Sequence, residues 1–195
     1  MSEWTEKGAG QTSQTLEVAV KAALLRSISH LVVATNTGAT AMMLMDHLAT
    51  EDREGRIQVV AVTHSSGFAV PGENEMTAEM RANLTSRGCL LVTAAHALSG
   101  AERSLSRKFN GIYPLEMIAQ TLRLFGQGTK VALEISLMAM DNGALPYQKP
   151  VIAIGGTGHG ADTAVLLTPG YSANFLDSRI HVILCKPLLM DHPTM

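Results

Sequence analysis

The sequence has little charge and few cysteines, and it lacks both a basic run and a long apolar run. Only 16% of its 195 residues are charged, and the net charge is −2. A nucleic-acid-binding surface needs a field of positive charge, so no DNA or RNA partner is expected. No apolar run has the length that crosses a bilayer, so no membrane partner is expected either. The two cysteines, Cys89 and Cys185, form no zinc motif and are predicted to be reduced, buried thiols.

What the chain does contain is enough hydrophobic sequence, 46% of its residues, for a substantial core. Residues 1–11 are predicted to be disordered or loosely packed. Residues 12–187 are predicted to form a single α/β domain, followed by a tail at residues 188–195. Residues 1–10 are polar and do not resemble a signal peptide, so a cytoplasmic location is expected.

Apolar runs alternate with amphipathic segments, which is typical of a parallel sheet with helices on both faces. Short apolar runs predict strands at residues 31–35, 57–63, 89–93, 151–154, 164–168 and 180–185. Helical spacing of apolar residues predicts helices at residues 12–29, 39–49, 74–87, 114–125 and 130–140. The late strands lie close together without full helices between them, which favours an antiparallel strand near the C-terminus.

The predicted helix at residues 130–140 is apolar almost all round, so deep burial is expected. Glu134 lies within it and therefore needs a buried partner. Burial inside one subunit and contact with a second copy explain this helix equally well, which leaves a homo-oligomer open.

Four predicted strands end in small, hydroxylated or histidine-bearing segments, at residues 35–40, 63–67, 95–100 and 155–163. Ligands of open α/β sheets bind beyond the carboxyl ends of the strands, so these segments predict a pocket. The first segment enters a helix, whose N-terminus has unpaired N–H groups that suit a phosphate. The alternative interpretation is a plain helix cap, with Thr37 as the N-cap residue.

His64 and His96 are the candidates for proton transfer, because each follows the end of a strand. A packing or hydrogen-bonding role is the alternative for both. The glycine-rich segment at residues 155–163 fits neither a dinucleotide fingerprint nor a P-loop. It permits close approach of a flat ligand, or it is a turn that Asp162 fixes. No motif supports a metal site. Arg103, with its basic neighbours on residues 107 and 108, either holds an anion or forms a solvated face.

In several of these segments the chain resembles stand-alone proteins related to the C-terminal domain of pyruvate kinase. The resemblance covers about residues 12–187. The stretches that carry it are VVATNTGATA, VVAVTHSSGF, AAHALSGAERSLSRKF, PLEMIAQTLRLFGQG, and VIAIGGTGHGADTAVLLTP followed by RIHVILCKP. The resemblance implies a three-layer α/β/α sandwich with a mixed, mostly parallel sheet. Pyruvate kinase catalysis belongs to a different, barrel domain, so kinase activity is not implied.

The resemblance also implies a ligand, because the matching turn of pyruvate kinase holds a phosphate of a sugar bisphosphate effector in some members. It implies FMN as the ligand of the stand-alone relatives. The implied phosphate contacts are Thr35, Asn36, Thr37, Gly38, Ala39 and Thr40. The rest of the expected cofactor-binding set, toward the flavin ring, is Thr63, His64, His96, Gly155, Gly156, Thr157 and Asp162.

The first hypothesis is therefore a protein that binds a phosphorylated small molecule, FMN in particular, at the carboxyl edge of the sheet. The second is a flavin-dependent oxidoreductase that uses the same pocket, with His64 or His96 near the ring. The third is a non-catalytic, effector-binding regulatory module. The substrate and the reaction do not follow from the sequence.

Overall fold

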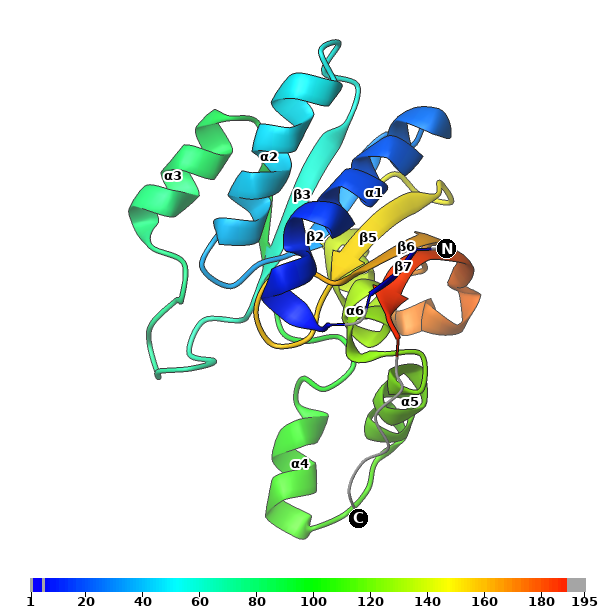
Figure 1. Ribbon diagram of the computed structural model, residues 1–195. Helices are drawn as coiled ribbons and strands as arrows, with labels where there is room; N and C mark the ends of the chain where they lie inside the picture. Colours follow the sequence, from blue (N-terminus) through cyan, green and yellow to red (C-terminus); the bar gives the residue numbers. More distant parts are fainter. Residues whose placement is uncertain (1, 5, 189–195) are drawn as a thin grey trace.

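The computed structural model describes residues 2–4 and 6–188, and its described strands form one seven-stranded sheet in the order β1-β7-β6-β5-β2-β3-β4 (Figure 1). The strands are β1 (Ser2–Trp4), β2 (His30–Ala34), β3 (Gln58–Thr63), β4 (Leu90–Thr93), β5 (Val151–Gly155), β6 (Thr163–Thr168) and β7 (Arg179–Pro187). Strand β6 is antiparallel to both of its neighbours, and the other neighbouring pairs are parallel. The predicted mixed, mostly parallel sheet with a late antiparallel strand is confirmed.

Helices cover both faces of the sheet and complete the three predicted layers (Figure 1). The helices are α1 (Thr12–Leu25), α2 (Ala39–Glu51), α3 (Ala78–Ser86), α4 (Glu102–Phe109), α5 (Pro114–Arg123) and α6 (Gln127–Asp141), with the 3-10 helices η1 (Gly8–Gln11) and η2 (Ser172–Asp177). Apolar residues of α1, α2 and α3 pack in the core on one face, and those of α5 and α6 in the core on the other. None of the helices in the described part of the chain is long and apolar enough to span a membrane.

Strand β2 shows why its sequence is an unbroken apolar run. Leu31 and Val33 belong to the core beneath α1 and α2, whereas Val32 belongs to the core beneath α6. Side chains alternate between the two faces of a strand, so a strand covered on both faces needs apolar residues at every position. Cys89 and Cys185 are buried, as predicted, and burial raises the pKa of the Cys89 thiol to about 11.

Two local predictions are wrong, and one helix was not predicted. Residues 1–11 were expected to be disordered or loosely packed, but residues 2–4 form β1 against β7 and residues 8–11 form η1. The helix expected from residue 74 begins after Thr77, whose hydroxyl accepts a hydrogen bond from Met80 N and caps α3. The segment before Pro114 was assigned no element, but it contains α4. The predicted tail at residues 188–195 lies outside the described residues except for Leu188.

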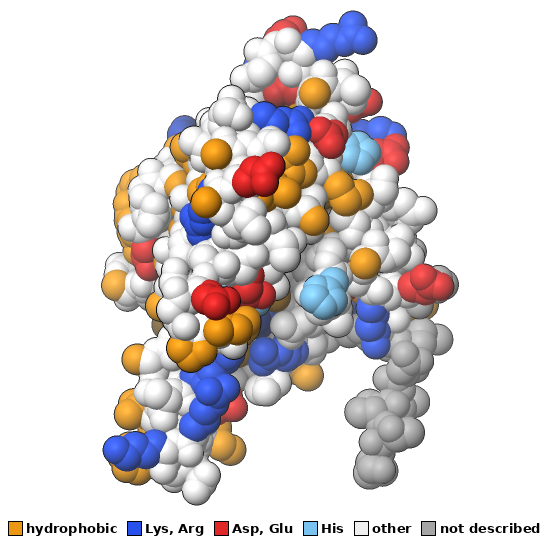
Figure 2. Space-filling view, turned by 90° about the vertical axis from the view of Figure 1, so that its left-hand side faces the viewer, with side chains coloured by type: hydrophobic (Ala, Val, Ile, Leu, Met, Phe, Trp, Pro, Cys, Tyr) orange, Lys and Arg blue, Asp and Glu red, His pale blue; other side chains and the backbone are white. Residues whose placement is uncertain are grey.

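Helix α4 projects from the body of the molecule and contains no buried residue. Hydrophobic and basic side chains are exposed together on this lower projection (Figure 2). Leu105 and Phe109 lie four residues apart on one face of α4, and both are exposed. Two apolar residues in an eight-residue segment are too short a pattern to predict a helix from the sequence.

Candidate functional site

The site lies at the switch point of the sheet, where the chain stops adding strands on one side of β2 and starts adding them on the other. From β2 the chain passes through α2 to β3 and β4 on one side, and α6 later returns it to β5 on the other side of β2. Ligands of open α/β sheets bind at such a switch point, beyond the carboxyl ends of the strands. A cavity of about 370 Å³ lies there, and its wall is formed by Ala34, Thr35, Asn36, Thr37, Ala39, Thr40, His64, Glu75, Gln127, Val131, Gly156, Gly158, His159 and Gly160.

The turn at residues 35–40, here called the 35–40 turn, leaves the N-terminus of α2 without a side-chain cap. The N-cap residue is Gly38, with φ of 99°, so the alternative in which Thr37 caps the helix is wrong. Thr35 Oγ1 accepts a hydrogen bond from Gly38 N at 3.1 Å and closes the turn. A Cβ atom at Gly38 would collide with the side chain of Met80, which is why glycine occupies this position. The N–H groups of the first turn of α2 therefore have no protein side chain as an acceptor at the N-cap.

A second cavity, of about 160 Å³, adjoins the first through shared walls at Asn36, His64 and Gln127. It extends beneath β3 and α6, and its other polar and aromatic wall residues are Thr63, Phe68, His96, Arg103, Arg123, Lys130 and Glu134. The two cavities lie side by side at the carboxyl ends of β2 and β3 and the start of α6.

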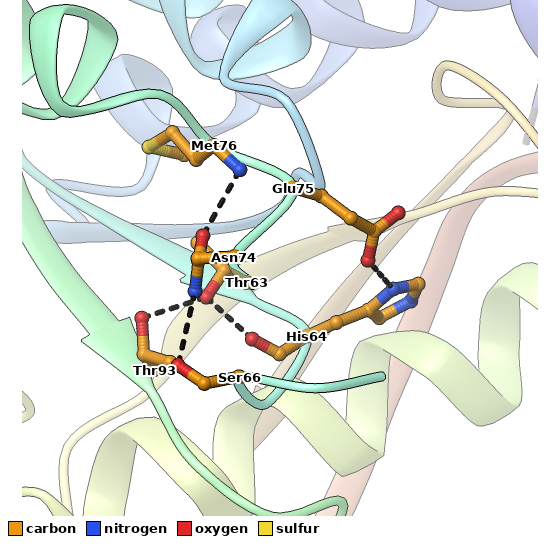
Figure 3. Close-up of polar contacts among 7 residues, drawn as sticks. All are labelled: Thr63, His64, Ser66, Asn74, Glu75, Met76 and Thr93. Carbon is orange, nitrogen blue, oxygen red and sulfur yellow. Dashed lines mark hydrogen bonds and ion pairs between the residues drawn. The ribbon is translucent and has the colours of Figure 1, made fainter. Parts of the chain in front are cut away.

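His64 is held from several directions (Figure 3). Its Nδ1 lies 2.6 Å from Glu75 Oε2. Thr63 Oγ1 donates a hydrogen bond to the carbonyl oxygen of His64 at 2.8 Å, and it also contacts Thr93 Oγ1 at 2.7 Å. The ring of Phe68 lies against the imidazole, with 3.9 Å between centroids. The position of the His64 ring is thus set by both its backbone and its side chain.

His96 lies beside His64, with 5.2 Å between the ring centroids. Burial is the main reason why the pKa of His96 is lowered from its ordinary value, and the neighbouring His64, Lys130 and Arg103 act in the same direction. Glu134 opposes the shift. The net direction keeps His96 a neutral imidazole at neutral pH.

Lys130 and Glu134 form a buried ion pair one turn apart on α6. Glu134 Oε1 also accepts a hydrogen bond from Leu98 N at 3.1 Å. Glu134 was predicted to need a buried partner, and it has two, Lys130 and Leu98 N. Burial lowers the pKa of Lys130, and the attraction of Glu134 only partly opposes that shift. Desolvation of the ammonium group therefore outweighs its pairing.

Asp162 fixes the glycine-rich loop between β5 and β6 and does not line either cavity. Its fully buried carboxylate accepts hydrogen bonds from Gly8 N at 2.8 Å, Thr157 N at 3.1 Å and Thr163 Oγ1 at 2.7 Å. Of the two predicted roles for Asp162, this geometry matches the structural one. Ala161 N donates to Thr12 Oγ1 at 3.0 Å, so the start of α1 also braces the loop.

Most of the predicted site residues meet in the two cavities. The predicted residues that line them are Thr35, Asn36, Thr37, Ala39, Thr40, Thr63, His64, His96 and Gly156. The predicted residues that do not line them are Gly38, Gly155, Thr157 and Asp162. Gly155 packs against the backbone of α6, where a Cβ would collide with Gly128 O. The described residues contain no group of three or more His, Cys, Asp or Glu side chains that would hold a metal ion.

Sequence reasoning missed Glu75, Gln127, Val131 and Lys130. Glu75 belongs to an irregular loop, and its nearness to His64 depends on how that loop folds. Gln127 is the first residue of α6 and lies between two glycines, which indicate a break between helices. The direction of α6 was not predictable without the sheet order. Of the three basic residues considered, only Arg103 lines the cavities.

Comparison with known proteins gives a family match along most of the chain. Residues 13–167 match the family model described as pyruvate kinase, alpha/beta domain. Similar solved structures include a pyruvate kinase from Cryptosporidium parvum, with 15% identity, a TM-score of 0.37, and coverage of 77% of this chain and 22% of that chain. Another is the same organism's pyruvate kinase in complex with ADP, with 15% identity, a TM-score of 0.38, and coverage of 92% and 25%. The chain thus spans about a quarter of the length of these proteins. On the extent of the family match, the chain belongs to the pyruvate kinase alpha/beta domain family.

Proposed function

We propose that the chain binds a phosphorylated small molecule in the larger cavity, with the phosphate on the 35–40 turn. The observation that carries the proposal is the N-terminus of α2, which faces the cavity and has no side-chain cap. The hydroxyl groups of Thr35, Thr37 and Thr40 and the amide of Asn36 belong to the same wall. Helix N–H groups together with the helix dipole favour a dianionic group at this position.

FMN is the phosphorylated molecule that we propose as the first to test. FMN is the ligand that the resemblance to the stand-alone relatives implies. With its phosphate on the 35–40 turn, its ring would extend toward the adjoining cavity at His64 and His96. An absorbance spectrum of the purified protein, with mass spectrometry of whatever denaturation releases, tests this directly. A yellow protein that releases FMN supports the flavin, and redox assays then test the oxidoreductase hypothesis. A protein that is colourless and does not take up added FMN argues against the flavin but not against the phosphate site.

The phosphate position has its own test in the variant Thr37→Asp. Thr37 is exposed on the 35–40 turn, so the change adds a carboxylate where the phosphate is proposed and disturbs no core packing. Like charges repel, and we expect affinity for FMN, measured by calorimetry, to fall at least tenfold. Thr50→Asp makes the same change at an exposed position at the other end of α2 and serves as the control. Equal affinity of both variants for FMN would remove the 35–40 turn from the phosphate site.

Gly38→Asp would place a carboxylate on the same turn, but it is a poor test. Its new side chain would collide with Met80 on α3, and the residue would also have to keep a positive φ. Loss of binding in that variant would not separate repulsion of phosphate from displacement of α2 and α3.

A further inference from the structure

We propose that His64, positioned by Glu75, is a general acid–base catalyst that removes a proton next to the carbonyl group of a small phosphorylated hydroxy-aldehyde or hydroxy-ketone. The inference rests on the proposed phosphate site, and it does not require that the occupant be FMN. Phosphate binding explains the polar groups of the 35–40 turn but not those around His64. The inference gives these other groups a role in a reaction.

The first support is the pairing of His64 with Glu75 (Figure 3). The carboxylate oxygen 2.6 Å from Nδ1 accepts the proton on that nitrogen, which leaves the Nε2 lone pair as the base. The two side chains retain 26% and 29% of their surface, so the pair is reachable from the cavity. Both residues line the same cavity as the 35–40 turn, so the base and the phosphate anchor act on one ligand.

The second support is a pair of hydrogen-bond donors that line the smaller cavity together with His64. Removing a proton next to a carbonyl group puts negative charge on the carbonyl oxygen, and a catalyst must stabilise that charge. His96 and Lys130 both line the smaller cavity, into which His64 also faces. A neutral imidazole and an ammonium group are both donors, and Glu134 keeps Lys130 in place on α6. An enolate oxygen in this cavity therefore has two donors available to it.

The third support is the size and the apolar wall of the smaller cavity. Its volume of about 160 Å³ is less than half that of the larger cavity, about 370 Å³, so it suits the short hydroxy-carbonyl end of a ligand whose phosphate lies on the 35–40 turn. Phe68 lies beside both imidazoles, with centroid distances of 3.9 Å to His64 and 5.1 Å to His96, and so adds an apolar wall next to the reacting atoms.

The step balances without any further reactant. His64 Nε2 takes the proton from the hydroxyl-bearing carbon beside the carbonyl group. The electron pair of that C–H bond forms the carbon–carbon double bond of an enediolate, and the carbonyl oxygen takes the negative charge. His64 returns a proton to the same carbon, which gives hydrogen exchange once the imidazolium proton has exchanged with solvent. Alternatively, the hydroxyl proton passes from its own oxygen to the oxygen that carries the negative charge, and His64 returns the proton to the neighbouring carbon, which gives the isomer.

The experiment follows exchange of carbon-bound hydrogen for deuterium in D₂O by proton NMR, with dihydroxyacetone phosphate as the probe. We expect exchange above the buffer rate for the unaltered protein and for His47→Gln, a histidine on α2 outside both cavities. We expect exchange to be about 10²-fold slower, or more, for His64→Gln, since general acid–base catalysis contributes about that much. A contaminating isomerase would give the same rate with every variant, and dihydroxyacetone without phosphate should exchange only at the buffer rate.

Glu75 acts through His64, so its test must measure the protonation of the His64 ring and not only the rate of exchange. Nitrogen-15 NMR of His64 reports which ring nitrogen carries the proton. We expect Nδ1 to carry it in the unaltered protein and the proton distribution to shift in Glu75→Gln, with an unchanged circular dichroism spectrum. A proton on Nε2 in the unaltered neutral protein would overturn the assignment of His64 as the base.

The outcomes separate this inference from the phosphate site. If dihydroxyacetone phosphate binds, and Thr37→Asp abolishes binding, but no exchange above buffer is seen, the catalytic inference is wrong and the phosphate site stands. The same holds if FMN occupies the cavity and excludes the probe. If neither dihydroxyacetone phosphate nor FMN binds, the phosphate site and this inference both fail.

Discussion

Replacing Lys130 by Met should destabilise the protein far more than an ordinary loss of an ion pair. The side chains of Lys130 and Glu134 expose only 6% and 4% of their surface. Removing one partner of a buried pair leaves an uncompensated charge, which typically costs about 3–5 kcal/mol. Glu134 would keep its hydrogen bond from Leu98 N, so the lower end, about 3 kcal/mol, is expected. Met is close to Lys in shape, so little is added by an altered packing volume.

The assay is urea unfolding followed by circular dichroism. With a slope of about 2 kcal/mol per molar urea, a loss of about 3 kcal/mol lowers the midpoint by about 1.5 M. Lys21→Met is the matched control, since Lys21 and Glu17 form a Lys–Glu pair with the same spacing on α1, with 66% and 51% of their side-chain surface exposed. Salt and water screen an exposed pair, so no measurable shift is expected there.

The combined variant Lys130→Met with Glu134→Gln tests whether the unpaired charge of Glu134 causes the loss of stability. The amide oxygen of Gln still accepts from Leu98 N, but the buried charge is gone, so most of the lost stability should return. If Lys130→Met shifts the midpoint no more than Lys21→Met does, the pair is not desolvated. If the combined variant is as unstable as the single one, the cost has a source other than the charge of Glu134.

Three further outcomes follow from the structure. Asp162→Ala should cost about 3 kcal/mol, because three donors, two of them buried, lose their acceptor, and hydrogen exchange should quicken at Gly8 and Thr157. Burial lowers the pKa of His96 below 6.5, so below that pH the unfolded chain binds more protons than the folded one and stability falls. His96→Gln should therefore flatten the dependence of urea stability on pH between about 7.5 and 5.5. The Cys89 thiol, with a pKa of about 11, should react with iodoacetamide at neutral pH only as fast as the protein unfolds.

Much of the fold was predictable because it follows from local hydrophobic pattern. The unbroken apolar runs of the central strands indicate burial on both faces of the sheet, and the structure confirms it. The nearly all-apolar sequence of α6 indicates a helix that is buried all round, and the structure confirms this too. The polar ends of β2, β3 and β5 indicated a site at one edge of the sheet, because parallel strands bring such ends together. The thiols of Cys89 and Cys185 were predicted correctly for the same local reason, since each lies within an apolar strand-like run.

Tertiary structure alone decided the contacts between segments that are distant or irregular. The hydrogen bond from Gly8 to Asp162 joins residues 154 positions apart, and the pairing of His64 with Glu75 depends on the path of a loop without regular structure. Strand β1 has three residues, too few to carry a pattern, and exists because β7 offers an edge. Periodicity reports which face of an element is buried, but the partner that buries it, and the side chains that meet there, depend on the order of strands and the direction of each connection.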